Sequence, residues 1–245
     1  MSLSHELVDG IPLVWSAPAS PAGLLIHIPA FGQTKEAAAP MVDRATSLGL
    51  VGIVLDAYQH GERGNEDREA LTRRVFANFR REMWTILGET TLDVPRVVAW
   101  ARQRFGSDLG LHLTGLSMGG DVAVAAAPLV DKVVSVNAVV ATPDWQRPGM
   151  QDIKTGELVD QGEPDPKAKL FFDALEPLHH ADRYKALPIH FINGAADQHV
   201  PPDGARRFKA MVGETNSIVI TEKPGLGHLD FIDPKAWIGE LRLNR

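Results

Sequence analysis

Short apolar runs alternate along the chain with longer segments in which apolar residues recur every three or four positions. Runs of the first kind predict buried strands, and segments of the second kind predict amphipathic helices. Strands are expected at 24–28, 50–55, 109–114, 133–140, 189–193 and 217–221, and helices at 37–48, 68–105, 121–129, 203–212 and 234–241. The first five strands are apolar enough to be covered on both faces, as parallel strands are. The alternation therefore predicts an α/β fold, a doubly wound and mostly parallel sheet with helices on both faces.

Two local signals refine this pattern. Asp9-Gly10 lies between apolar segments at 6–8 and 12–16, and an Asp-Gly pair suits the two-residue turn of an antiparallel hairpin, which we expect at the edge of the sheet. Pro95 lies inside the long helical segment 68–105. Because proline lacks an N–H and clashes with the preceding turn, we expect this helix to be broken or kinked near Val94-Pro95.

The segment 142–187 interrupts the alternation. It follows the strand expected at 133–140, which is the sixth when the two hairpin strands are counted. It is far longer than an ordinary connection between a strand and a helix, and it contains many prolines and glycines. Its aromatic residues Trp145, Phe171 and Phe172 supply apolar surface that can dock it. We expect a cap insertion over a functional site, within a single domain that spans residues 1–245.

Composition then excludes several classes of function. A net charge of −6 and a pI of about 5.8 give no overall attraction to nucleic acid or to anionic membranes. The chain has no cysteine, which excludes disulfides, thiolate metal sites and a cysteine nucleophile. It has neither a signal-peptide pattern at its start nor an apolar run of about 20 residues, so a cytoplasmic location is expected. A homodimer is left open.

The strongest chemical signal is Gly115-Leu116-Ser117-Met118-Gly119-Gly120, which lies between an expected strand and a helix rich in small residues. Glycines on both sides permit a sharp strand-to-helix turn that exposes the serine hydroxyl. The alternative is a serine that only caps the following helix. The flanking pattern favours Ser117 as a nucleophile.

A serine hydroxyl needs a base to accept its proton, and the base needs a third group to orient it. Asp197 follows the strand at 189–193, and His228 lies in a glycine-rich loop after the last strand. Ser117, Asp197 and His228 thus occur in the order serine, acid, histidine, each after a strand, where open α/β sheets place their sites.

Other residues compete for these roles. Asp144 follows the strand at 133–140 and is an alternative acid, and His199 is an alternative base close to Asp197. His60 is expected to bond within its own loop. His179 and His180 are expected to be structural or solvated rather than metal ligands, and we expect no metal site.

Together these motifs resemble the α/β-hydrolase superfamily, in particular its esterase, prolyl-oligopeptidase-like and dienelactone-hydrolase-like branch. The resemblance extends from about residue 24 to residue 241 and includes the elbow at 115–120, the segments at 56–64 and 194–201, and the Gly-Leu-Gly-His motif ending at His228. It implies that Ser117 attacks an ester carbonyl, that His228 accepts and returns the proton, and that Asp197 holds the imidazolium. No cofactor is implied.

The resemblance also implies an oxyanion hole. One donor is the backbone N–H of Met118, and the second comes from the loop after the first core strand. Family members usually have His-Gly-Phe or His-Gly-Gly there, whereas this chain has Pro29-Ala30-Phe31. Phe31 is therefore expected to be the second donor. Tyr58 and Trp145 are expected to contact the substrate.

The expected activity is that of a serine esterase acting on small to medium carboxylic esters. The charged composition of 142–187 favours a small pocket over the broad apolar mouth of a lipase, so acetyl to about hexanoyl esters are expected to be the best substrates. A serine peptidase or a thioesterase is the alternative on the same scaffold. A homologue that binds a small molecule without catalysis is the alternative from another class.

Overall fold

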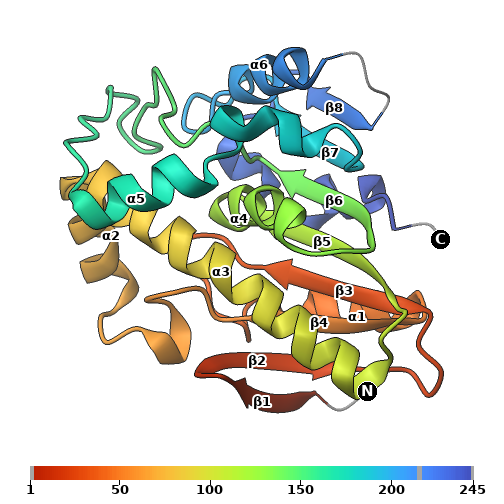
Figure 1. Cartoon of the computed structure of the whole chain (residues 1–245). Helices are drawn as coiled ribbons and strands as arrows, with labels where there is room; N and C mark the ends of the chain where they lie inside the picture. The colour runs from red at the N-terminus through yellow and green to blue at the C-terminus, as the bar shows by residue number, and fades with distance from the viewer. Residues whose placement is uncertain (1–2, 214–216, 244–245) are drawn as a thin grey trace.

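The computed structural model describes residues 3–213 and 217–243, which form an eight-stranded sheet with strand order β1-β2-β4-β3-β5-β6-β7-β8 (Figure 1). Neighbouring strands from β4 to β8 are parallel, and β1 and β2 join them as antiparallel strands at one edge. The mostly parallel sheet is confirmed. The strands are β1 (Ser4–Val8), β2 (Ile11–Ser16), β3 (Gly23–Ile28), β4 (Leu50–Leu55), β5 (Gly110–Leu116), β6 (Val133–Val139), β7 (Ile189–Gly194) and β8 (Ile218–Lys223).

The edge hairpin is confirmed in its turn as well. Asp9 and Gly10 join β1 to β2 with φ angles of 49° and 82°. A two-residue turn with both φ angles positive matches the right-handed twist of the strands, and Asp-Gly tolerates it well.

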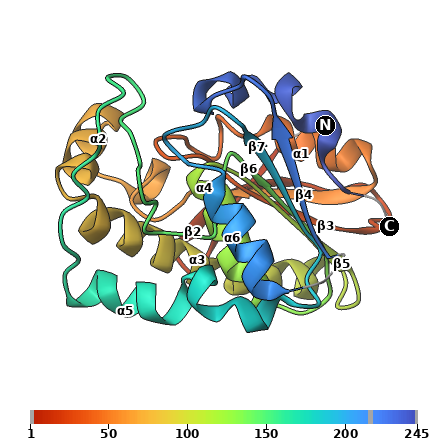
Figure 2. The ribbon, with the colours of Figure 1, turned by 90° about the horizontal axis from the view of Figure 1, so that it is seen from above.

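Helices cover both faces of the sheet, as predicted (Figure 2). On one face, α1 (Pro40–Ser47) packs with the C-terminal segment around Phe231 and Trp237. The other face carries α3 (Phe79–Phe105), α4 (Met118–Ala126) and α6 (Asp203–Val212). Side chains from alternate strand positions enter the two cores, so both faces of the central strands are buried. Among the described helices, none is long and apolar enough to cross a bilayer.

The long helical segment breaks at Asn78 and not at Pro95. It forms α2 (Arg68–Ala77) and then α3, which continues through Pro95. Asn78 has φ −155° and ψ 85°, and its side chain accepts a hydrogen bond from the N–H of Arg81 at 3.2 Å, so it caps α3. Buried residues on both sides of Pro95, including Val94 and Val97, hold the helix against the sheet and outweigh the proline.

The helix predicted at 234–241 is also wrong. The chain there forms two short 3₁₀ turns, η5 (Pro234–Ala236) and η6 (Ile238–Glu240), which follow a third, η4 (His228–Phe231). Asp233 accepts a hydrogen bond from the N–H of Lys235 at 3.0 Å and starts a new turn, and Trp237 leaves helical geometry at φ −142°. Further short turns are η1 (Gly61–Arg63) and η2 (Ala127–Leu129), the second extending α4.

The insertion at 142–187 contains α5 (Pro166–Leu175) and η3 (Pro177–Tyr184). Helix α5 lies along α3 in both ribbon views (Figures 1 and 2). The ring of Phe172 stacks on Trp84 with 4.1 Å between centroids, and Phe171 fills the space beside Gly88. The insertion is therefore docked on the helical layer by its aromatic residues.

Candidate active site

Ser117 occupies a strained turn between β5 and α4. Its φ and ψ are 52° and −120°, a region that residues other than glycine seldom adopt. Its N–H donates to the carbonyl of Val139 on the neighbouring strand at 2.8 Å. Its side chain makes no capping hydrogen bond to α4. The helix-cap alternative therefore does not describe this serine.

Two glycines permit this turn because backbone atoms approach them too closely for any side chain. A Cβ on Gly115 would lie 2.0 Å from the carbonyl oxygen of Gly119, and a Cβ on Gly119 would lie 2.0 Å from that of Ile28. The start of α4 is thus pressed against both β5 and β3. This contact brings Ser117 next to the loop that follows β3.

The structure brings Ser117, His228 and Asp197 together at the carboxyl edge of the sheet. Oγ of Ser117 lies 3.0 Å from Nε2 of His228, and Nδ1 of His228 lies 2.7 Å from Oδ2 of Asp197. Asp197 is almost completely buried, and its Oδ1 accepts backbone N–H bonds from His199 at 2.9 Å and Val200 at 2.8 Å. The loop after β7, residues 195–201, is called the acid loop below. It fixes the carboxylate of Asp197, and this carboxylate can in turn fix the imidazole of His228.

The two competing residues lie in other environments. Asp144 is paired with Arg207 and accepts a hydrogen bond from the N–H of Gln146 at 2.9 Å. The Nδ1–H of His199 donates to the carbonyl of Gln151 at 3.0 Å, and burial lowers the pKa of His199 to about 4. The geometry therefore favours Asp197 over Asp144 as the partner of His228.

His60 bonds within its own loop, as expected. Its Nδ1 lies 2.9 Å from the carbonyl oxygen of Tyr58. Its ring contacts Phe31 edge to face, with 5.2 Å between centroids. Burial lowers the pKa of His60, which favours the neutral imidazole.

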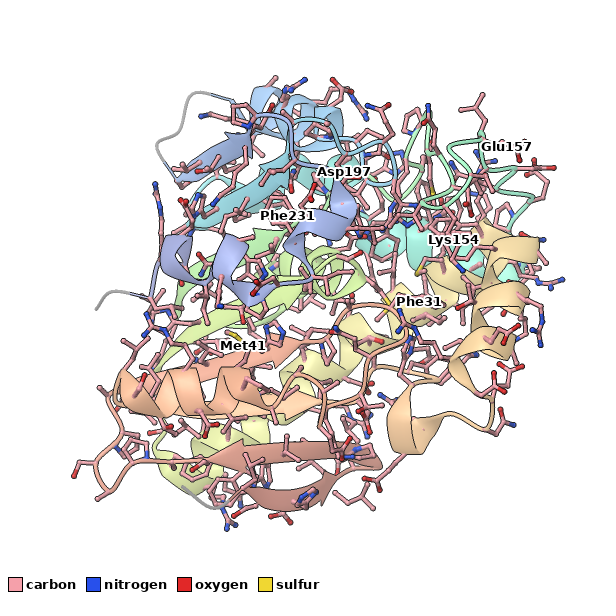
Figure 3. All side chains as sticks on the ribbon, turned by 180° about the vertical axis from the view of Figure 1, so that it is seen from behind. Phe31, Met41, Lys154, Glu157, Asp197 and Phe231 are labelled. Carbon is pink, nitrogen blue, oxygen red and sulfur yellow. The ribbon has the colours of Figure 1, made fainter. Side chains whose placement is uncertain are left out.

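The loop after β3 lies against the turn that carries Ser117, on the side where the sequence predicts an oxyanion hole. A Cβ on Gly119 would lie 2.6 Å from the carbonyl oxygen of Pro29, so this loop and the start of α4 are in direct contact. Pro29 has no N–H, and the N–H of Ala30 donates to Oε1 of Gln33 at 3.2 Å. Phe31 carries the next N–H along the chain. Figure 3 shows Phe31 and Asp197 toward the same edge of the sheet.

The two residues predicted to contact substrate differ in accessibility. Tyr58 is half-buried on the loop after β4 and lines a cavity of about 440 Å³ together with neighbours that include Arg63 and Arg74. Lys167 of the insertion lies 5.6 Å from the centroid of its ring. Trp145 is completely buried, and its backbone carbonyl accepts a hydrogen bond from Nε1 of Trp84 at 2.9 Å. A substrate would reach the Trp145 ring only if its neighbours moved.

No group of three or more His, Asp or Glu side chains that could hold a metal ion occurs in the described part of the chain. His180 bonds to the backbone, with Nε2 2.9 Å from the carbonyl oxygen of Asp173. His179 lies beside the buried carboxylate of Glu176.

A line of rings beside Ser117 was not expected from the sequence. Phe76, at the end of α2, lies 6.2 Å from Phe31 and 5.9 Å from His199 between ring centroids, and His199 lies 5.0 Å from His228. All four rings are half-buried. In the sequence Phe76 is one apolar position in an amphipathic helix, so no local signal distinguishes it from an ordinary core residue.

No protein-family model and no curated protein matches this sequence. Solved structures do resemble the fold. TT1662 from Thermus thermophilus superposes with a TM-score of 0.72 at 20% identity, over 98% of this chain and 95% of that one. A proposed dienelactone hydrolase from Klebsiella pneumoniae gives 0.70 at 16% identity, over 98% and 96% of the two chains.

An esterase from Pyrococcus furiosus, Pf2001, gives a TM-score of 0.68 at 16% identity, over 98% of this chain and 89% of that one. Peptidases also occur among the similar structures. Hydrolases of several kinds thus share the overall fold of this molecule. The chain has the α/β-hydrolase fold.

Proposed function

We propose that this protein is a serine hydrolase that cleaves small to medium carboxylic esters through an acyl-enzyme formed on Ser117. The observation that carries the proposal is the unbroken chain of contacts from Oγ of Ser117 through His228 to the buried carboxylate of Asp197. The occurrence of esterases and other hydrolases among proteins with this fold supports it.

Each residue has a distinct role in this reaction. Oγ of Ser117 attacks the ester carbonyl carbon while its proton passes to Nε2 of His228, and Asp197 accepts the Nδ1–H bond and stabilises the imidazolium. The N–H groups of Met118 and Phe31 hold the negative oxygen of the tetrahedral intermediate. The leaving alcohol takes the proton from His228. Water then repeats these steps on the acyl-enzyme and releases the acid.

A serine peptidase or thioesterase would use the same residues, and a protein that only binds a small molecule would keep the site without turnover. A fluorophosphonate probe reacts with an activated serine. It therefore distinguishes an esterase, peptidase or thioesterase from a protein that only binds a small molecule. We expect covalent labelling of Ser117, and none in Ser117→Ala. Hydrolysis of matched p-nitrophenyl esters, thioesters and peptide anilides then ranks the substrate classes, and faster turnover of anilides would replace the esterase with a peptidase.

The proposal extends to the length of the acyl chain. The insertion carries many charged side chains, and in Figure 3 its Lys154 and Glu157 lie toward the same edge of the sheet as Phe31. We propose a small acyl pocket, in which each methylene that fits contributes about 0.8 kcal/mol and each one beyond contributes nothing. Values of kcat/KM should rise from C2 to about C6 and then fall or stay level. A steady rise to C12, or activation at an emulsion surface, would instead make the insertion a lipase lid.

A further inference from the structure

A buried acidic residue lies directly behind the nucleophile. Asp121 is four residues after Ser117 on α4, and its N–H donates to the carbonyl of Ser117 at 3.1 Å. Its side chain is completely buried, and Oδ1 accepts the N–H of Thr142 at 2.7 Å, where the insertion begins. Its Oδ2 pairs with the guanidinium of Arg147. Burial raises the pKa of Asp121, and the charge of Arg147 opposes that shift.

Arg147 is an unusual residue in its own right. It is 4% exposed, and its φ of 44° lies in the left-handed region that residues other than glycine seldom adopt. Its guanidinium lies 5.3 Å from the ring centroid of Phe79 on α3. Its carbonyl accepts bonds from Nε2 of Gln161 at 3.0 Å and from the N–H of Met150 at 3.1 Å. An arginine in this setting fixes its segment tightly to α4.

The same segment reaches the acid loop four residues later. The N–H of Gln151 donates to the carbonyl of Gln198 at 2.9 Å, and the carbonyl of Gln151 accepts the Nδ1–H of His199 at 3.0 Å. The N–H of His199 in turn donates to Oδ1 of Asp197. Residues 147–151 therefore connect α4, the helix that begins directly after Ser117, with the loop that carries Asp197.

We propose that residues 147–151 form a strap that sets the distance between the nucleophile and its acid–base pair, with Asp121 and Arg147 as positioning residues. The strap rests on the proposed function of Ser117, Asp197 and His228. It assigns the first part of the insertion a role separate from that of α5, which packs on α3. Neither Asp121 nor Arg147 needs to touch the substrate.

The expected effect follows from how steeply catalysis depends on geometry. A displacement of about 1 Å in a catalytic group can cost about 100-fold in rate. Loss of the Arg147 guanidinium also leaves the Asp121 carboxylate buried without its partner, and His228 lies within its electrostatic reach. A released strap should therefore slow attack by Ser117, while substrate binding changes little.

The experiment measures turnover and the rate of fluorophosphonate labelling of Ser117 on the full chain. Arg147→Met should lower kcat by about 10- to 100-fold, with KM within about twofold, and should slow fluorophosphonate labelling of Ser117 by a similar factor. Arg147→Lys keeps a charge for Asp121 and should recover part of both rates. The matched control is Arg102→Met, which removes a largely buried arginine paired with Asp131 near the start of β6, at the opposite edge of the sheet. It should leave kcat unchanged.

The possible outcomes distinguish failure of the strap from failure of the proposed function. If Arg147→Met does not fold, Asp121→Asn supplies the test, because it removes the charge but keeps an acceptor for Thr142, and it should also slow labelling by at least about tenfold. Folded variants that are labelled as fast as wild type overturn the strap and leave the proposed function standing. A wild-type protein that is neither labelled nor active overturns the proposed function, and the strap with it.

Discussion

The turn between β5 and α4 that carries Ser117 and the insertion at 142–187 are held in place by contacts of different kinds. At the turn, backbone packs on backbone, with Gly119 against the carbonyl of Ile28. In the insertion, α5 is held by side-chain contacts, such as the ring of Phe172 on Trp84 and the ammonium of Lys167 at 2.6 Å from Glu89. A backbone contact leaves almost no freedom in residue choice, whereas a side-chain contact can be made by many pairs. The turn is therefore rigidly specified, and the insertion is open to change.

The largest expected effect removes the nucleophile from the rigid region. Ser117→Ala should lower turnover by several orders of magnitude, because the three catalytic groups act as a unit. Folding should be retained, since the hydroxyl makes no capping bond to α4. Turnover is measured on the best short-chain ester, with circular dichroism as the control for folding. Residual activity near the wild-type rate would remove Ser117 from the mechanism.

The next effect separates the catalytic pair from its neighbours. His228→Ala and Asp197→Asn should each lower kcat far more than His199→Ala and Asp144→Asn, because only the first pair continues the line of contacts from Ser117. Turnover should also fall at acid pH, where a protonated imidazole cannot accept the serine proton. A greater loss of kcat in His199→Ala than in His228→Ala would assign the base to His199. A greater loss of kcat in Asp144→Asn than in Asp197→Asn would assign the acid to Asp144.

A third prediction compares glycines in the two regions. Gly119→Ala would put a Cβ 2.0 Å from the carbonyl oxygen of Ile28, so the free energy of unfolding should fall by about 3 kcal/mol or more. Gly156→Ala in the insertion meets no atom within 4 Å and carries only the strain of φ 71°, about 1 kcal/mol. Urea unfolding of both variants measures the difference. Equal losses would mean that the turn can relax around a side chain.

The sequence predicts the turn at Ser117 and its proximity to Asp197 and His228, but not the contacts of the insertion. Continuous apolar runs mark β3 to β7, and glycine spacing marks Ser117, because both signals lie within a few consecutive residues. The pairing of Asp121 with Arg147 joins residues 26 positions apart, and nothing local to either residue indicates the other. No local signal marks Phe76 either, because its ring contacts Phe31 and His199, which are distant from it in the sequence.

Errors in the predicted helices have a related cause. Pro95 has a strong local preference against helix, yet burial on both sides of it keeps α3 continuous. The segment 234–241 has a helical pattern, yet the Asp233 side chain and the conformation of Trp237 divide it into separate turns. Tertiary packing decides in the first case, and side-chain capping decides in the second.

The last predicted effect is spread over several pH units and gives the insertion and the sheet opposite responses to pH. Glu176 of the insertion is completely buried, and burial raises its pKa from 4.5 to about 7, with the nearby charge of Asp144 adding to the shift. The folded state therefore keeps this proton where the unfolded chain has lost it. The resulting stabilisation is fully present below pH 4.5 and is lost as pH rises toward about 7, at roughly 1.4 kcal/mol per pH unit.

His27 of β3 responds in the other direction. Burial lowers its pKa from 6.5 to about 3, so stability is present above pH 6.5 and is lost as pH falls toward 3. Urea unfolding between pH 5 and pH 8 tests both signs. Relative to wild type, Glu176→Gln should remove a loss of stability between pH 5 and pH 7, and His27→Gln should remove a loss below pH 6.5, each by about 1.4 kcal/mol per pH unit at most. If Glu176→Gln keeps the wild-type slope, the insertion does not hold this carboxyl away from water, and its packing is looser than that of the sheet.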